Sequence, residues 1–281
     1  MKYTNTAGLP EPLFRAVTND PYSSGDCDYS TTTLIKPARI VALERRHAAE
    51  LTEDASERIW SLIGQIGHLI LERSASKELA EKRFFATRMG RKIGGQIDLW
   101  NNEALLDYKL TSIWAAKDGV KPEWEQQMNI NALLCRENGV TVRAAQIVAI
   151  YRDWSVGAAR RDSDYPRSQV QVLSVPIWTA ERQEAFIAGR LSAHIAAQNG
   201  TLPECTPLER WARPEVWAVM KEGNKRAIRL YDTEIEATVK AAPDPKLYVE
   251  HRPGVQTRCE DYCAVSQFCD WWKQYHKKAK A

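Results

Sequence analysis

Two aspartates and a lysine lie in a largely apolar stretch of the chain, GGQIDLWNNEALLDYKLTS, which runs from position 94 to 112. Side chains two residues apart in a strand point to the same face, so Asp107 and Lys109 are predicted to share one face. If Asn101 and Asn102 form a hairpin turn, Asp98 lies on the neighbouring strand, diagonal to Asp107 and within reach of it. The spacing therefore predicts two carboxylates that converge beside one ammonium group.

Two carboxylates at short distance are unfavourable in a protein interior, because like charges repel and lose their hydration. A divalent cation such as Mg²⁺ or Mn²⁺ relieves this cost, since it binds carboxylate oxygens, a backbone carbonyl and waters. The Tyr108 carbonyl is a candidate ligand, and Lys109 would orient or deprotonate a metal-bound water and stabilise developing negative charge. Such a site hydrolyses a phosphodiester. An exposed hairpin with a surface salt bridge is the alternative interpretation of these residues alone.

A helix is predicted just before these strands, over residues 55 to 72, because apolar residues recur there at helical spacing. Asp54 or Ser56 is placed to cap its start. The apolar residues are Ile59, Leu62, Ile63, Ile66, Leu69 and Ile70. Gln65, His68 and Glu72 share the opposite, polar face. A histidine on a polar helix face is commonly a bystander, so His68 by itself predicts little.

Further elements follow at regular intervals along the chain. Three strands are predicted over 82–89, 91–100 and 103–112, separated by turn residues. A helix over 122–139 begins with Pro122 and ends before Gly139, and Gln127 and Asn131 lie one turn apart in it. Two more strands, 142–154 and 168–178, and a helix over 179–200 complete the series. This order predicts an α/β fold, with a mixed sheet flanked by helices and its first strands antiparallel.

Three regions differ in composition. Residues 1–28 are rich in Pro, Gly, Asn and Ser and are predicted to form an extended N-terminal arm. Residues 29–200 hold the strands and helices described above and form the predicted core. Residues 201–281 begin with the proline-bounded LPECTP, contain a predicted hairpin over 217–232 and end in a polar segment with cysteines. We expect this last region to be an appendage that packs on the core.

The composition excludes some classes of protein. No apolar run has the length that a bilayer requires, and the start, MKYTNTAGLPEPLF, lacks the pattern of a signal peptide. We therefore expect a soluble, cytoplasmic protein with no membrane partner, long enough to bury a core without disulfides. The net charge of +3 is by itself weak evidence for a nucleic-acid partner.

Taken together, these residues resemble the RecB-like branch of the PD-(D/E)xK nucleases. The matching pieces are G-x-x-x-H from Gly64 to His68, Glu81 by position, G-x-x-D from Gly95 to Asp98, D-Y-K from Asp107 to Lys109, and the helical Gln127. Each piece is weak alone, but their order and spacing over roughly residues 30 to 155 are specific. The resemblance implies a restriction-endonuclease-like core.

The resemblance also implies roles for individual residues. The metal ligands would be His68, Asp98, Asp107 and the Tyr108 carbonyl, while Lys109 would serve the attacking water and Gln127 would position the lysine or the DNA backbone. Gln126 competes with Gln127 for that role, and Gln127 is preferred because QMNIN keeps the family's Q-x-x-x-Y spacing. Asn131 stands where the family often has tyrosine, which puts its DNA contact in doubt. A salt bridge is an equally good interpretation of Glu81.

The chain has six cysteines, and three of them, Cys259, Cys263 and Cys269, lie within eleven residues. In a cytosolic chain such a group is more often metal-binding than disulfide-bonded. Cys205, in LPECTP, is the preferred fourth ligand and Cys27 the rival, whereas Cys135 is expected to pack inside its helix. Spacing alone does not decide between structural Zn²⁺ and a 4Fe-4S cluster. The resemblance favours the cluster, because several RecB-like nucleases carry one on similarly arranged cysteines.

We therefore expect a DNA nuclease that depends on Mg²⁺ or Mn²⁺, with exonuclease action preferred and single-stranded or end-bearing DNA as its partner. No phosphate-binding G-x-x-x-x-G-K-[ST] loop is present, so the chain is expected to act without a helicase motor. By analogy with phage-encoded and CRISPR-associated members, roles in recombination or phage DNA metabolism follow. Two alternatives stay open, a DNA-end or junction-binding protein that does not cleave and a zinc-stabilised adaptor.

Overall fold

The computed structural model describes residues 1–19, 23, 25–74, 79–117 and 119–279. The chain divides into two compact units, Met1–Leu202 and Pro203–Ala281.

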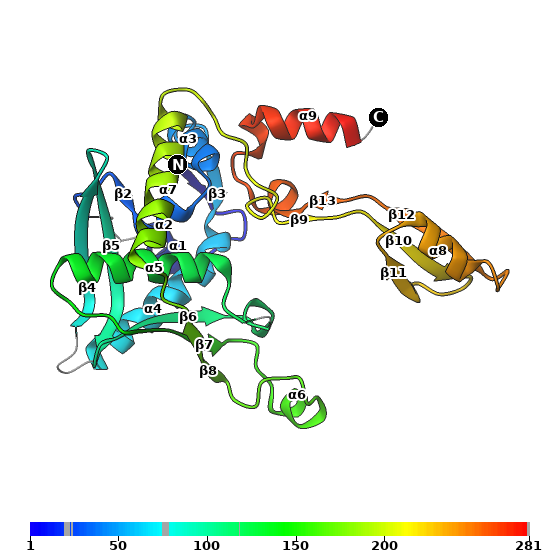
Figure 1. The fold of residues 1–281 in the computed structure, drawn as a ribbon, viewed down its shortest axis with the longest axis horizontal. Coiled ribbons are helices and arrows are strands. Elements are labelled where there is room, and N and C mark those ends of the chain that lie inside the picture. The colour runs from blue at the N-terminus through cyan, green and yellow to red at the C-terminus, as the bar shows by residue number, and fades with distance from the viewer. Residues whose placement is uncertain (20–22, 24, 75–78, 118, 280–281) are drawn as a thin grey trace. The chain divides into compact units, whose positions relative to one another are not determined.

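A mixed sheet forms the centre of the first unit. In the described part of this unit its strands are β2 (Tyr29–Ser30), β4 (Leu79–Arg88), β5 (Arg91–Asn101), β6 (Ala104–Thr111), β7 (Ala144–Tyr151) and β8 (Val170–Val175). The order is β2-β5-β6-β7-β8, with β4 on the other edge of β5. Strands β4, β5 and β6 are antiparallel, β6 and β7 are parallel, and β4 and β5 form a long hairpin (Figure 1). The predicted α/β class and the antiparallel start of the sheet are confirmed.

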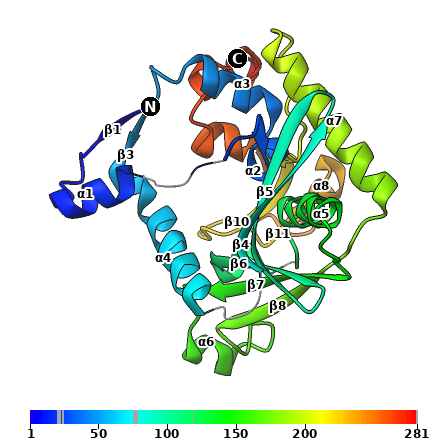
Figure 2. The same ribbon diagram turned by 90° about the vertical axis from the view of Figure 1, so that its left-hand side faces the viewer.

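Helices flank this sheet, and the described ones are α1 (Glu11–Thr18), α2 (Thr31–Ile35), α3 (Ala38–Arg46), α4 (Ile59–Ser74), α5 (Pro122–Glu137), α6 (Val156–Arg161) and α7 (Ala180–Gln198). Short 3₁₀ turns cover Ala55–Arg58 and Ile113–Ala115. A small parallel pair joins β1 (Lys2–Thr4) to β3 (Thr52–Asp54). Figure 2 shows α5 end-on, between β5 and α7.

Helix α5 is the centre of the hydrophobic core. Every residue from Met128 to Cys135 is buried, because the sheet and α7 both pack on this helix. Its buried Asn129 accepts hydrogen bonds from the Trp178 backbone N–H at 2.7 Å and the Gln183 side chain at 3.1 Å. It donates to the Pro176 carbonyl at 3.0 Å. A buried amide is tolerated when it is fully bonded, and here it fixes α7 and the preceding loop to α5.

A second buried amide, that of Asn131, fixes α5 to β5 and α2. It donates to the Gln96 carbonyl at 3.2 Å and accepts from the Thr31 hydroxyl at 2.8 Å. Gly95 lies against this pair, and a Cβ there would be 2.4 Å from Asn131 Oδ1 and 2.7 Å from Thr31 Oγ1. Residue 95 must therefore lack a side chain for α5 to approach β5 this closely.

The structure differs from the sequence prediction at the N-terminus and along the first long helix. Residues 1–28 were predicted as an extended arm, but they contain β1 and α1, whose start is set by Pro10 with Glu11 in the first turn. In α4, Ile66, Leu69 and Ile70 remain between 46% and 57% exposed. The helix instead packs through Gly67, where a Cβ would be 2.9 Å from the Leu110 side chain.

The second unit contains a small sheet with order β11-β10-β12, made of β11 (Arg229–Tyr231), β10 (Val216–Lys221) and β12 (Leu247–Arg252). Helix α8 (Glu234–Ala241) packs on it through Ala237 and Val219. The predicted hairpin over 217–232 corresponds to β10 and β11. A second pair, β9 (Ala212–Arg213) and β13 (Val255–Gln256), precedes the helical turns Arg258–Tyr262 and Ser266–Phe268 and helix α9 (Asp270–Ala279).

None of the helices in the described residues combines the length and apolar character needed to cross a bilayer.

The close approach at Gly95 predicts a large loss of stability on substitution. Gly95→Ala is expected to lower the free energy of unfolding by about 2–4 kcal/mol, because the added methyl group overlaps Asn131 and Thr31. Gly189→Ala is the matched control, since Gly189 lies in α7 with no atom near its Cβ position. The free energy of unfolding of this control should rise by up to about 1 kcal/mol, because alanine has a higher helix propensity than glycine. Urea denaturation measures both, and equal stability of the two variants would contradict the packing described for residue 95.

Candidate metal centre and its cavity

The site begins where strands β5 and β6 separate. One edge of β5 pairs with β2 at Ile93 and Gly94 and with β6 from Leu99 to Asn101, so the edge between them carries no strand. At the point of separation, Asp98 Oδ2 accepts the Tyr108 backbone N–H at 2.7 Å. The carboxylate thus replaces a ladder bond between the strands.

A cavity of about 460 Å³ lies at this separation. Most of its lining residues are polar, and they come from β2, α2, α4, β4, β5, β6 and α5: Ser30, Thr31, Thr32, Ser61, Gly64, Gln65, His68, Glu81, Gly94, Gln96, Asp98, Asp107, Lys109 and Gln127. Segments that are distant in the sequence therefore meet at one place.

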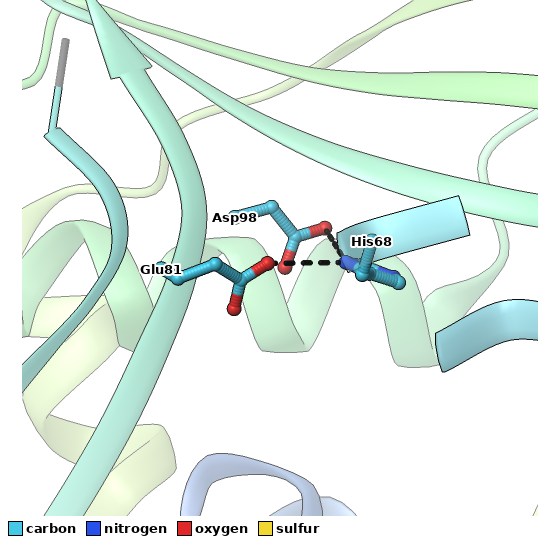
Figure 3. A group of neighbouring side chains, drawn as sticks. All are labelled: His68, Glu81 and Asp98. Carbon is cyan, nitrogen blue, oxygen red and sulfur yellow. Dashed lines mark hydrogen bonds and ion pairs between the residues drawn. The ribbon is translucent and has the colours of Figure 1, made fainter. Parts of the chain in front are cut away.

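One side of the cavity holds a histidine and two carboxylates. His68 Nδ1 lies 3.4 Å from Glu81 Oε1 and 3.5 Å from Asp98 Oδ2 (Figure 3). Ligand atoms of these three residues all lie within 4.8 Å of one another, which suits a single metal ion. From its position in the sequence, Glu81 could be either a metal ligand or one partner of a salt bridge. The structure brings Glu81 into this group, opposite Asp98 across the β4–β5 pair.

Sequence reasoning missed Gln96, which holds Glu81 in place. The Gln96 amide donates to Glu81 Oε2, and its oxygen accepts from the Arg83 guanidinium. Gln96 lies two residues before Asp98 in β5 and therefore on the same face, a signal that was available in the sequence. The Glu81 backbone has φ 48°, a left-handed conformation that non-glycine residues seldom adopt outside sites where the surroundings enforce it.

The other side of the cavity holds Asp107, Lys109 and Gln127. Gln127 Nε2 donates to Asp107 Oδ1 at 3.0 Å, and Gln127 Oε1 accepts from Lys109 Nζ at 3.1 Å. Because one amide bridges both residues, the geometry favours Gln127 over Gln126. The β5–β6 register, continued from Leu99 opposite Leu106, places Asp98 directly opposite Asp107. The predicted diagonal placement was therefore wrong. Asn101 is the last residue of β5 and pairs with Ala104, so the turn consists of Asn102 and Glu103 and not of the predicted Asn101 and Asn102, which shifts the register.

Burial and mutual repulsion control the charges at the site. Burial and the nearby Asp107 carboxylate raise the pKa of Asp98 to about 7. The hydrogen bond to Glu81 raises the pKa of His68, against the effect of its burial. Burial alone would raise the pKa of Glu81, but its bonds to His68 and Gln96 outweigh this and lower it.

The donor set fits a hard divalent cation. Asp107 is 3% exposed, and its Oδ2 has no hydrogen-bond donor. Lys109 Nζ lies 2.7 Å from that oxygen, a charge contact whose direction does not suit a hydrogen bond. A buried carboxylate oxygen without a donor retains a lone pair for a metal. Carboxylate oxygens with one imidazole nitrogen are ligands that Mg²⁺ and Mn²⁺ accept.

The Asn131 side chain and the Tyr108 backbone both form hydrogen bonds beside the site. Asn131 is buried and bonded to Gln96 and Thr31, so its side chain stabilises the core. Tyr108 reaches the site through its backbone N–H, which donates to Asp98.

Four of the cysteines, Cys205, Cys259, Cys263 and Cys269, lie in the second unit. Burial and the neighbouring Cys263 and Cys269 raise the pKa of the Cys259 thiol to about 11. The buried Arg210 is close to this group, since its charge acts on Cys259 and its guanidinium donates to the Cys205 carbonyl. Arg210 thus bonds the Cys205 backbone and lies near Cys259.

The other two cysteines lie in the first unit. Cys27 packs beside Gly94, its Sγ 2.9 Å from the position that a Cβ of residue 94 would take. Cys135 is fully buried in α5, and burial raises the pKa of its thiol to about 12. Cys135 thus packs as a small apolar side chain, as predicted.

Comparison with known proteins gives low similarity only. No family model and no curated protein sequence matches the chain. Among solved structures, the protein SSO0001 aligns with a TM-score of 0.45 and 19% identity over 68% of this chain and 86% of its own. An alkaline exonuclease from Laribacter hongkongensis aligns with a TM-score of 0.36 and 14% identity over 68% of this chain and 93% of its own. A candidate exonuclease from Eubacterium rectale aligns with a TM-score of 0.32 and 13% identity over 53% of this chain and 54% of its own.

The raised pKa of Asp98 predicts a dependence of stability on pH in metal-free protein. Folded Asp98 loses its proton near pH 7, whereas its ordinary pKa is 3.8, so stability falls as pH rises between these values. An asparagine side chain cannot ionise. In EDTA, the free energy of unfolding of Asp98→Asn should therefore exceed that of the wild type by at most about 4 kcal/mol above about pH 7 and equal it below about pH 4. Denaturant titrations at both pH values measure this. The exposed Asp26→Asn is the control, and a difference for Asp98→Asn that does not change with pH would contradict the prediction.

Proposed function

We propose that the protein is a metal-dependent DNA nuclease that hydrolyses phosphodiester bonds. The observation that carries the proposal is the meeting of His68, Glu81 and Asp98 with the Asp107–Lys109–Gln127 group in one cavity. The metal ligands proposed are His68, Glu81, Asp98 and Asp107, with the Tyr108 carbonyl as a further candidate. When bound, Mg²⁺ or Mn²⁺ would supply positive charge to the scissile phosphate and acidify a bound water.

Lys109 is the proposed catalytic residue for the attacking water. Its ammonium group lies between Asp107 and Gln127, so the side chain is held in one position at the cavity. From there it can orient a water or exchange a proton with it, and stabilise charge on the phosphate oxygens. Gln127 is a positioning residue, because its amide contacts both Asp107 and Lys109.

The charge balance of the cavity supports dependence on a cation. Three carboxylates line it, against Lys109 and the titratable His68. A phosphodiester carries a negative charge and is repelled from such a site unless a divalent ion offsets the carboxylates. DNA is the proposed substrate, and exonuclease action the proposed mode, on the family resemblance of the motifs.

Removal of Lys109 or Asp107 is expected to abolish cleavage while leaving the fold intact. Lys109→Ala and Asp107→Ala should each lower the rate at least about a hundredfold, because they remove the water-orienting group or a metal ligand. The assay uses labelled single-stranded and duplex DNA with Mg²⁺ or Mn²⁺, and with EDTA. Lys246→Ala, an exposed lysine of the second unit, is the matched control. Cleavage unaffected by both substitutions would refute the assignment, and DNA binding without any cleavage would favour a DNA-end-binding protein.

For the second unit, we propose that Cys205, Cys259, Cys263 and Cys269 hold a structural 4Fe-4S cluster, with Zn²⁺ as the alternative. The spacing of the cysteines supports this, and burial together with the nearby Cys263 and Cys269, which raise the pKa of Cys259, places at least these three thiols in one neighbourhood. Arg210 would support the ligand set through the Cys205 carbonyl, since its guanidinium also bonds Gln256 at 2.9 Å and stacks 4.2 Å from the Trp271 ring centre.

Metal analysis of cysteine variants tests this ligand set. Cys205→Ser should lose bound metal, whereas Cys27→Ser and Cys135→Ala should retain it. Protein purified without oxygen is analysed for iron, sulfide and zinc, and for broad absorption near about 400 nm. Stoichiometric zinc in colourless protein would select Zn²⁺, and metal loss from Cys27→Ser but not from Cys205→Ser would reverse the choice of ligand.

A further inference from the structure

A second cavity, of about 350 Å³, lies at the carboxyl end of β6 and is separate from the metal centre. Its wall includes Trp114, Tyr165 and Leu173, and its polar groups include Lys117, Asp153 and Gln171. The volume is at the lower end of the range for small-molecule sites. A lining of aromatic rings with a few polar groups suits a ligand that consists of one planar ring system.

Aromatic rings and cations gather at this end of the strand. Trp114 is 73% exposed, with Lys117 Nζ 5.0 Å from its ring centre. Trp60, at the first turn of α4, is 56% exposed, and the Arg152 guanidinium lies 3.9 Å from its ring centre. We call Trp60, Trp114, Lys117 and Arg152 the aromatic end site. Large exposed rings beside cations have no function in core packing and are suited to stacking on bases.

Two elements join the aromatic end site to the metal centre. Strand β6 carries Lys109 and leads to Ile113, about 13 Å further along a strand. Helix α4 carries His68 and leads back to Trp60 over about 12 Å. The Arg152 N–H donates to the Thr111 carbonyl and the Ile113 N–H to Asp153 Oδ1, each at 2.9 Å, which ties the end of β6 to the end of β7. The Arg152 guanidinium then links this end to Trp60 of α4. These distances of about 12–13 Å between the metal centre and the aromatic end site correspond to roughly two to four nucleotides of one DNA strand.

The charges of this cavity select a base over a phosphate. Asp153, Asp162 and Asp164 line it, and carboxylates repel phosphate but accept hydrogen bonds from the amino groups of bases. Lys117 lines the cavity and Arg152 lies beside Trp60, so both cations are available to phosphates that flank a bound base. Base pairs in a duplex cover the faces and edges of their bases, so only an unpaired nucleotide can enter.

We propose that the aromatic end site binds an unpaired nucleobase of the substrate, a few nucleotides from the scissile phosphate, and so selects single-stranded DNA. This rests on the proposed nuclease function for the position of the scissile phosphate. Trp114 stacks on the base, and Trp60 with Arg152 supports the adjoining nucleotide.

Binding measurements with a cleavage-deficient protein test the proposal. In the Lys109→Ala background with Mg²⁺, fluorescence anisotropy gives the Kd for a labelled single-stranded oligonucleotide and for a blunt duplex. Trp114→Ala should weaken single-strand binding roughly 5- to 150-fold, the range for loss of one base stack, and leave duplex binding nearly unchanged. Trp114→Phe should restore most of the affinity. Met89→Ala, which removes an exposed apolar side chain on the β4–β5 turn, is the control.

An abasic scan locates the captured base. Removal of single bases along the oligonucleotide should weaken binding most at one position, and Trp114→Ala should remove that position's effect. Equal single-strand affinity of Trp114→Ala and its parent, or equal losses for single strand and duplex, would overturn the inference. A wild-type protein that binds single strands through Trp114 but cleaves nothing would overturn the nuclease proposal and leave the base site standing. A protein that cleaves DNA but binds single strands equally well with and without Trp114 would support the nuclease proposal and overturn the base site.

Discussion

The repulsion between buried carboxylates is the constraint on which the centre of the first unit depends. Asp98 and Asp107 face each other where β5 and β6 separate, and their proximity, with burial, raises the pKa of Asp98 to about 7. The protein offsets this charge with specific partners: His68 beside Glu81 and Asp98, Lys109 beside Asp107, and the Tyr108 N–H on Asp98. The metal binding proposed above would offset the same repulsion with a cation.

The buried helix α5 holds this unfavourable group in place. Gln127 projects from it to the site, while Asn131, one turn later, bonds β5 and α2 through Gln96 and Thr31. The approach is close enough that Gly95 has no space for a methyl group. Rigid support of this kind fixes catalytic groups within small tolerances. The same geometry explains why Asn131, at a position that resembles a DNA-contacting one, has a structural role here.

Both units contain residues whose proposed ligands would add stability. In the first unit, β6 and α4 connect the acidic cavity with the aromatic end site, so the elements that position the acidic residues also set their distance from Trp60 and Trp114. In the second unit, the buried Arg210 bonds the Cys205 carbonyl and lies near Cys259. On the functions proposed above, a metal bound at either place would stabilise the folded state.

The sequence by itself determined the α/β class and the order of the central strands and helices, because strand alternation and turn residues are local properties. It also singled out Asp98, Asp107 and Lys109 as candidate site residues. Tertiary structure decided what depends on distant segments. Glu81 and Gln96 join the site only because β4 pairs with β5 in one register, and Asp98 lies opposite Asp107 through the register of the turn. The orientation of α4, which leaves apolar residues exposed and turns His68 inward, follows from packing at Gly67 that no periodicity reveals.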